Sequence, residues 1–160
     1  MGTIRFDRIY GTEIWEIATA EFSISPNKEK FKTNIWIETQ DDAIEKLEDT
    51  GCYATIIELV FPLNKIPNFT ESFHFKMPKI EEVEDNWEED KDYFCNWYYY
   101  EHRWIESLEI EINKVSKDIF KIQIIGMVED PIDSSSEINT KLTIEFETNM
   151  NKELNGHWAC

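Results

Sequence analysis

Residues 138–147, with the sequence INTKLTIEFE, decide the fold, because apolar and polar side chains alternate along them. Successive side chains of a β-strand point to opposite faces, so this period of two predicts a strand with one buried and one wet face. The predicted inward residues are Ile138, Leu142, Ile144 and Phe146, and the predicted outward residues are Asn139, Lys141, Glu145 and Glu147.

The same period of two recurs through most of the chain and predicts further half-buried strands. Turns are predicted at residues 25–27 and 114–118, where Ser, Pro, Asn and charged residues interrupt the alternation. The predicted inward sets are Ile14, Ala18, Ala20, Phe22 and Ile24; Phe31, Thr33, Ile35 and Ile37; Phe69, Phe73, Phe75 and Met77; Leu108, Ile110 and Ile112; and Phe120, Ile122, Ile124 and Val128.

Two stretches depart from this pattern. Residues 39–49 combine a capping residue, Thr39 or Asp41, with apolar residues at helical spacing and a glycine just beyond the end, which predicts one short helix. Residues 53–61 are apolar on both parities. That stretch predicts a strand covered on both faces, in a central position of the sheet.

These elements predict a mainly β protein, an antiparallel β-sandwich or partly open barrel of about eight strands with one short helix. An α+β fold is the alternative. A chain of 160 residues has the usual length of one domain, so residues 1–160 are expected to form a single unit.

The charge of the chain restricts its partners. Asp and Glu number 33 against 16 Lys and Arg, which gives a formal net charge of -17. Repulsion disfavours direct binding to a nucleic-acid backbone. No apolar run approaches the roughly 20 residues that span a bilayer, and residues 1–8 lack the apolar core of a signal peptide. We therefore expect a cytoplasmic protein that binds neither nucleic acid nor membrane directly.

The sequence lacks the common motifs for catalysis or cofactor binding. The three cysteines (Cys52, Cys95 and Cys160) lack CxxC spacing, and the five glycines are too far apart for a phosphate-binding loop. The histidines (His74, His102 and His157) have no second pair of residues at metal-ligand spacing. The sequence therefore predicts no catalytic residue, no metal and no cofactor.

One segment points to a binding function. Eight of the twelve residues 81–92 are acidic, only Lys91 opposes them, and a dense aromatic stretch follows up to Trp104. The plain alternative is a solvated acidic loop followed by core aromatics. However, the four consecutive aromatic residues 97–100 cannot all face inward on a strand. The candidate partner-binding residues are Glu84, Asp85, Trp87, Glu88, Glu89, Asp90, Asp92, Trp97, Tyr98 and Tyr100.

Acidic residues also occupy the outward parity of several predicted strands. They are expected to form an acidic sheet face that favours a positively charged partner, although solubility alone is the simpler explanation. These residues are Glu13, Glu21, Glu109, Glu111, Glu145 and Glu147.

These features predict a non-catalytic acidic binding protein that neutralises a basic protein, such as a toxin or a nucleic-acid-binding enzyme. In size, acidity and lack of catalytic motifs the chain resembles bacterial immunity proteins, and an acidic phage-encoded inhibitor would have the same features. Two alternatives come from other classes. A small-ligand β-barrel would turn the aromatic rings inward, and a carboxylate-dependent hydrolase would use a pair of acids.

Overall fold

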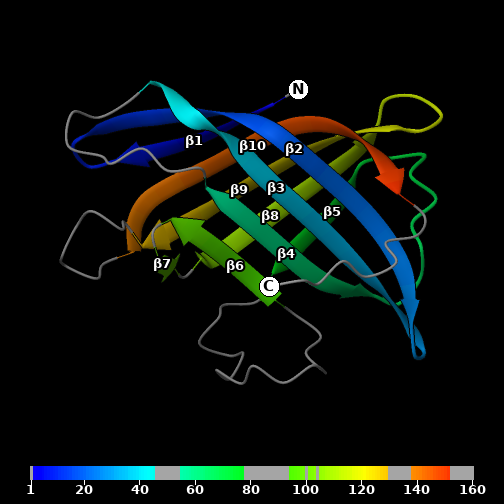
Figure 1. Ribbon diagram of the computed structural model, residues 1–160. Coiled ribbons are helices and arrows are strands. Elements are labelled where there is room, and N and C mark those ends of the chain that lie inside the picture. Colours follow the sequence, from blue (N-terminus) through cyan, green and yellow to red (C-terminus); the bar gives the residue numbers. More distant parts are fainter. Residues whose placement is uncertain are drawn as a thin grey trace.

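The computed structural model of the protein describes residues 2–45, 55–77, 94–99, 101–103, 105–129 and 138–151 (Figure 1). Ten strands form one sheet in the order β5-β8-β9-β10-β1-β2-β3-β4-β6-β7, and no helix occurs within these ranges. The strands are β1 (Thr3–Arg8), β2 (Gly11–Asn27), β3 (Lys30–Glu45), β4 (Ile56–Leu63), β5 (Phe73–Met77), β6 (Phe94–Tyr99), β7 (Glu101–Arg103), β8 (Ile105–Lys114), β9 (Ile119–Glu129) and β10 (Ile138–Asn151).

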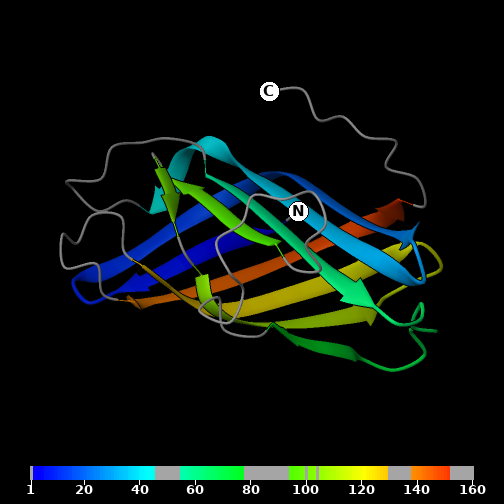
Figure 2. The same ribbon diagram turned by 90° about the horizontal axis from the view of Figure 1, so that it is seen from below.

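The sheet curls until it is nearly closed. In Figures 1 and 2, β2, β3, β4 and β6 form one layer, and β5, β8, β9 and β10 form a second layer that crosses behind it. Strands β6 and β8, from opposite ends of the sheet, approach each other. All neighbouring strands are antiparallel except for a short parallel pairing of β10 with β2. The prediction of a mainly β, antiparallel, partly open barrel is confirmed.

Large apolar side chains fill the space between the two layers. Trp15, Phe6, Phe22 and Phe61 are fully buried there. Phe69 lies on the loop before β5 and packs edge-on against Phe22 and Phe120, with ring centroids 6.4 and 5.0 Å apart. The inward sets predicted for β8 and β9 are buried, as are those of β10 except Ile138, which is exposed at an irregularity in the β9–β10 pairing.

The first half of β2 has the opposite parity to the prediction. Trp15 and Ile17 are buried, whereas Ile14 is only partly buried and Ala18 is exposed. The β2–β3 pairing contains successive register shifts between residues 14 and 19, and one extra residue in a strand moves all following side chains to the other face. The prediction is correct again from Ala20 onward, beyond these irregularities.

Glu13 was predicted to face solvent, and this is wrong for the same reason. Its carboxylate is fully buried and accepts a hydrogen bond of 2.5 Å from the guanidinium of Arg8. Burying an ion is expensive unless an opposite charge pairs with it, so Arg8 makes the inward position of Glu13 tolerable. Arg8 also lies over the ring of Phe6, 5.5 Å from its centroid.

The helix predicted for residues 39–49 is wrong as far as the structure describes that stretch. Residues 39–45 continue β3, which pairs with β2, and residues 46–49 lie outside the described ranges. Thr39 is no helix cap, because its Oγ1 accepts a hydrogen bond from the amide of Thr55 beside the start of β4. Pairing with a neighbouring strand outweighs a weak local helical preference.

Three other local predictions concern one strand and two turns. The doubly covered strand is confirmed as β4, whose residues 57–61 are buried on both faces and which lies between β3 and β6. The turn at residues 114–118 is confirmed, since β8 ends at Lys114 and β9 begins at Ile119. The first predicted turn lies later than expected, because β2 extends through Asn27 and Lys28 takes up the positive φ of 53°.

Candidate partner-binding faces

The predicted binding segment falls mostly outside the described residues. Residues 84–92 and Tyr100 are not among them, and Trp97 is described only by its backbone, which pairs with Ile57 and Arg103. Tyr98 is therefore the one candidate whose side chain can be placed. It is 40% exposed, which agrees with the prediction that part of this aromatic run faces outward.

Tyr98 lies on the β6–β7 hairpin, the last pair of strands at one end of the sheet. Its backbone pairs with that of Ile56 on β4, and its carbonyl oxygen accepts a hydrogen bond of 2.8 Å from the Thr55 hydroxyl. These contacts fix the backbone from which its ring projects. The acidic run ends at Asp92, only two residues before β6 begins.

The outward side of the β2–β3–β4–β6 layer, here called the Trp36 face, carries Tyr98 together with acidic and aromatic residues that β2, β3 and β4 contribute. Ile35, Ile37, Ile57 and Phe22 point into the core, so their neighbours along each strand face outward. The register then places Glu21 and Glu58 on either side of Trp36, and Glu38 and Tyr98 on either side of Ile56.

Glu58 is the most unusual residue of the Trp36 face. It is only 3% exposed, and its Oε1 has no hydrogen-bond partner. Burial raises the pKa of this carboxyl to about 7, although the nearby charge of Lys32 opposes the shift. The Oδ1 atom of Asn34, two residues before Trp36 on β3, is also buried without a partner. Two acceptors on this face thus lack donors.

Glu21 and Glu38 complete the acidic set around Trp36. Both are partly buried, as is Trp36 itself. Neither carboxylate forms an ion pair or a side-chain hydrogen bond in the part of the chain that the structure describes. No ion pair among the described residues therefore compensates Glu21 or Glu38, although the charge of Lys32 acts on Glu58.

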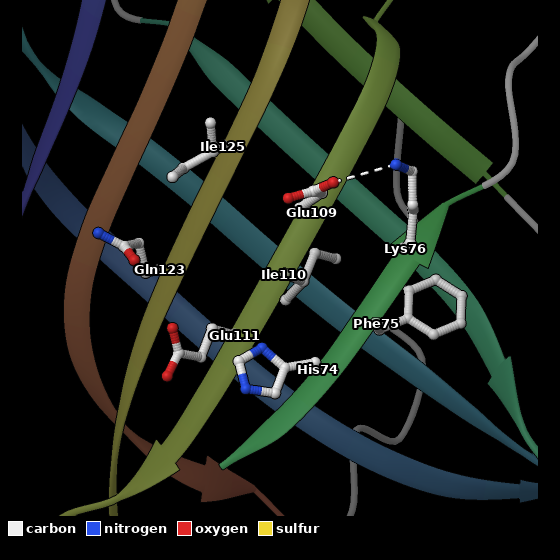
Figure 3. Close-up of a pocket in the computed structure, with 8 residues that line it drawn as sticks. All are labelled: His74, Phe75, Lys76, Glu109, Ile110, Glu111, Gln123 and Ile125. Atoms are coloured by element: carbon white, nitrogen blue, oxygen red, sulfur yellow. Dashed lines mark hydrogen bonds and ion pairs between the residues drawn. The ribbon is translucent and has the colours of Figure 1, made fainter.

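The opposite outward surface, here called the β8–β9 face, spans β5, β8, β9 and β10. It contains a shallow depression of about 340 Å³ (Figure 3). Lys76 on β5 forms an ion pair of 3.1 Å with Glu109 on β8, across the edge of this depression. The depression is lined by His74, Phe75, Lys76, Glu109, Ile110, Glu111, Gln123 and Ile125.

Three acids of the β8–β9 face, Glu109, Glu111 and Glu145, have polar partners. Asn113 donates a hydrogen bond of 2.9 Å to Glu111, which holds the pKa of that carboxyl below its usual range, and Gln123 donates one of 2.5 Å to Glu145. The outward positions predicted for Glu109, Glu111, Glu145, Glu147 and Glu21 agree with the structure, whereas that of Glu13 does not. Within the described residues, Glu147 is the one acid of this group on the β8–β9 face that has no polar partner.

The sequence reasoning missed Trp36 and Glu58. A signal for Glu58 was present, because it is the one charged residue in the apolar stretch 53–61. A lone acid within a doubly buried strand is costly unless it is protonated or paired, so it marks an unusual environment. Trp36 lies on the polar parity of its strand, between Asn34 and Glu38, and that position was also a visible signal.

Searches for metal sites, membrane spans and known relatives gave no further lead. The described residues contain no group of three or more His, Cys, Asp or Glu side chains placed to hold a metal ion. Among the same residues, none forms a helix with the length and apolar character needed to cross a membrane. Comparison of the chain with protein-family models, with curated proteins and with solved structures found no match.

Proposed function

We propose that the protein is a non-catalytic, cytoplasmic binding protein that neutralises a basic protein, in the manner of an immunity-type inhibitor of a nuclease or another toxin. The observation that carries this proposal is the Trp36 face, where Glu21 and Glu38 have no ion-pair partner among the described residues and Tyr98 is exposed. Exposed Tyr and Trp rings beside carboxylates are typical of surfaces that bind cationic proteins.

The protein would inhibit its partner by excluding the nucleic-acid substrate from the partner's basic surface. A nuclease must present cations to the phosphates of its substrate, and the carboxylates of an acidic inhibitor would occupy that region. The net charge of -17 would accelerate the encounter, because complementary fields raise association rates by about 10-fold to 1,000-fold. The aromatic rings would then supply contact area that slows dissociation.

The two alternatives receive less support. A small-ligand barrel needs an interior cavity, whereas the described interior contains the fully buried side chains of Trp15, Phe22 and Phe61. A carboxylate-dependent hydrolase needs an acid and a second carboxylate. The carboxyl of Glu58 has a pKa raised to about 7, but it is buried, and its cross-strand neighbours are Trp36 and Asn96 rather than a second carboxylate.

Co-purification from the native host tests the proposal. The chain, tagged so that both termini stay accessible, should retain a basic protein at low salt and release it at high salt, as mass spectrometry of the eluates would show. Recovery of no basic protein at low salt would overturn the proposal.

A kinetic measurement tests the role of the acidic run. Reversing the charge of Glu88 and Glu89, which lie outside the described residues, should slow association with the recovered partner by about 10-fold and change dissociation less. Stopped-flow mixing at two salt concentrations would measure both rates. An unchanged association rate would place the contact elsewhere on the molecule.

A further inference from the structure

Trp36 occupies the centre of a group of oxygen acceptors on the Trp36 face. Glu21 on β2 and Glu58 on β4 are its direct cross-strand neighbours, and such neighbours have Cβ atoms about 4.5–5.5 Å apart. Asn34 and Glu38 lie two residues away on β3 itself, on the same side of the strand. Three residues with carboxyl groups and one with an amide are therefore neighbours of Trp36 on this face.

Two of these residues have a buried oxygen that lacks a donor. Glu58 is almost completely buried, yet its Oε1 accepts no hydrogen bond, and the same is true of Oδ1 of Asn34. A buried acceptor without a donor destabilises the folded protein, so such atoms are rare in native structures and require an explanation. A bound group that brings several N–H donors and a positive charge would satisfy them.

We propose that Trp36, together with Glu21, Glu38 and Glu58, binds a cationic side chain of the basic partner, a lysine ammonium or an arginine guanidinium. This inference rests on the proposed function and names the chemical group that the partner inserts. Trp has the most favourable ring for a cation–π contact, and both cations carry only donors, which matches a site made of acceptors. A phosphate or a carboxylate would be repelled.

The partial exposure of the site agrees with this role. Trp36, Glu21 and Glu38 are partly buried rather than enclosed, so an incoming side chain can reach the indole from solvent. Glu58 supplies the buried end of the site, where a charge–charge contact is screened least. Lys32 also acts on Glu58, and the structure records no ion pair or hydrogen bond between the two described residues.

The β8–β9 face provides a matched control. Glu145 is an outward-facing carboxylate on β10, but it already accepts a hydrogen bond from Gln123, and its cross-strand neighbours are Gln123 and Thr3. A peptide attracted only by the overall negative charge of the protein would have no preference for Trp36 over this position.

Protein labelled with ¹⁵N should be titrated with N-acetylated, C-amidated tri-arginine and tri-lysine peptides, with tri-glutamine as the neutral control. The indole N–H signal of Trp36 should shift more than those of the other five tryptophans. Comparison of the titrations with tri-arginine and tri-lysine shows which cation binds more tightly. At pH 8, above the pKa of about 7 for Glu58, the Glu58→Gln and Glu38→Gln variants should each bind about fivefold more weakly, in line with a charge contact at a partly desolvated site. Glu145→Gln should leave the affinity unchanged.

Equal loss of affinity in Glu38→Gln and Glu145→Gln, or shifts spread evenly over all indole signals, would overturn the inference. Circular dichroism melts of each variant exclude misfolding, and Glu38→Gln keeps the test decisive if Glu58→Gln alters the fold. The two proposals can fail separately. If Glu38→Gln binds the recovered partner as tightly as the wild type, the inference fails and the function stands. If the peptides bind at Trp36 but no basic protein is recovered, the function fails and the inference stands.

Discussion

The two outward faces of the barrel handle acidic residues in opposite ways. On the β8–β9 face, Glu109 is paired with Lys76, and Glu111 and Glu145 accept hydrogen bonds from side-chain amides. On the Trp36 face, Glu21 and Glu38 form no ion pair within the described part of the chain, and Glu58 is buried with an unpartnered oxygen. A carboxylate that has partners contributes to stability, whereas one without partners is available for binding.

The comparison shows that net charge alone does not locate a binding surface. Both faces carry several glutamates, yet the pKa values of Glu58 on one face and Glu111 on the other are shifted in opposite directions. Hydrogen bonding to Asn113 lowers the pKa of Glu111, and burial raises that of Glu58 to about 7. The first carboxyl favours the folded state when it is ionised, and the second opposes folding when it is ionised. Stability measurements can therefore separate the two faces without knowledge of the partner.

The largest expected effect is on stability at Glu58. Its folded pKa of about 7 lies above the usual 4.5, so the folded state holds the proton more tightly, and stability should fall as pH rises from about 4.5 to about 7. A shift of this size corresponds to about 3 kcal/mol. Glu58→Gln should therefore raise the free energy of unfolding at pH 8 by up to about 3 kcal/mol and leave it nearly unchanged at pH 4.

Urea denaturation at a series of pH values measures this effect. Glu111→Gln is the matched control on the other face and should lower the free energy of unfolding at neutral pH. This loss should shrink as the pH falls below the unfolded-state pKa and disappear below the lowered folded-state pKa of Glu111. If Glu58→Gln were destabilising at pH 8, the carboxylate would have a favourable partner, and the contrast between the faces would disappear.

A smaller effect is expected on the rate of partner association. Glu38→Lys on the Trp36 face should slow association with the recovered partner several-fold, because charge close to a contact surface dominates the steering of the encounter. Glu147→Lys, an exposed position on β10, changes the net charge equally and should have a weaker effect. Surface plasmon resonance at low and physiological salt would rank the two variants. The reverse ranking would place the interface on the β8–β9 face.

The smallest effect is expected from the ion pair on the β8–β9 face. The Lys76 and Glu109 side chains are 73% and 67% exposed, and exposed pairs contribute little, typically less than about 1 kcal/mol. Lys76→Ala should therefore change the thermal midpoint only slightly, as calorimetry would show. A loss of several degrees would indicate that this pair is part of a larger stabilising network.

The strands with unbroken alternation could be predicted from the sequence. The inward residues of β8 and β9 were identified correctly, because a period of two along an uninterrupted strand fixes the face of each side chain. The first half of β2 and residues 39–45 could not be predicted in this way. Their conformation depends on the irregular pairing of β2 with β3, which involves residues far apart in the chain.

Only the character of the proposed binding surface was predicted from the sequence. The sequence indicated an acidic and aromatic surface, and Tyr98 is exposed as expected, but the acidic run itself lies outside the described residues. Trp36 and Glu58 are separated by 21 intervening residues, and only the β3–β4 register makes them neighbours. Local sequence patterns do not predict cross-strand contacts of this kind.

The sequence by itself determined that this chain forms an antiparallel β structure with a strongly acidic surface, since alternation and composition are local properties of the chain. The tertiary structure alone decided which acids are paired, buried or left uncompensated. The physical reason is that the state of a carboxylate depends on its burial and on the donors within hydrogen-bond reach, and both are set by strand order and register.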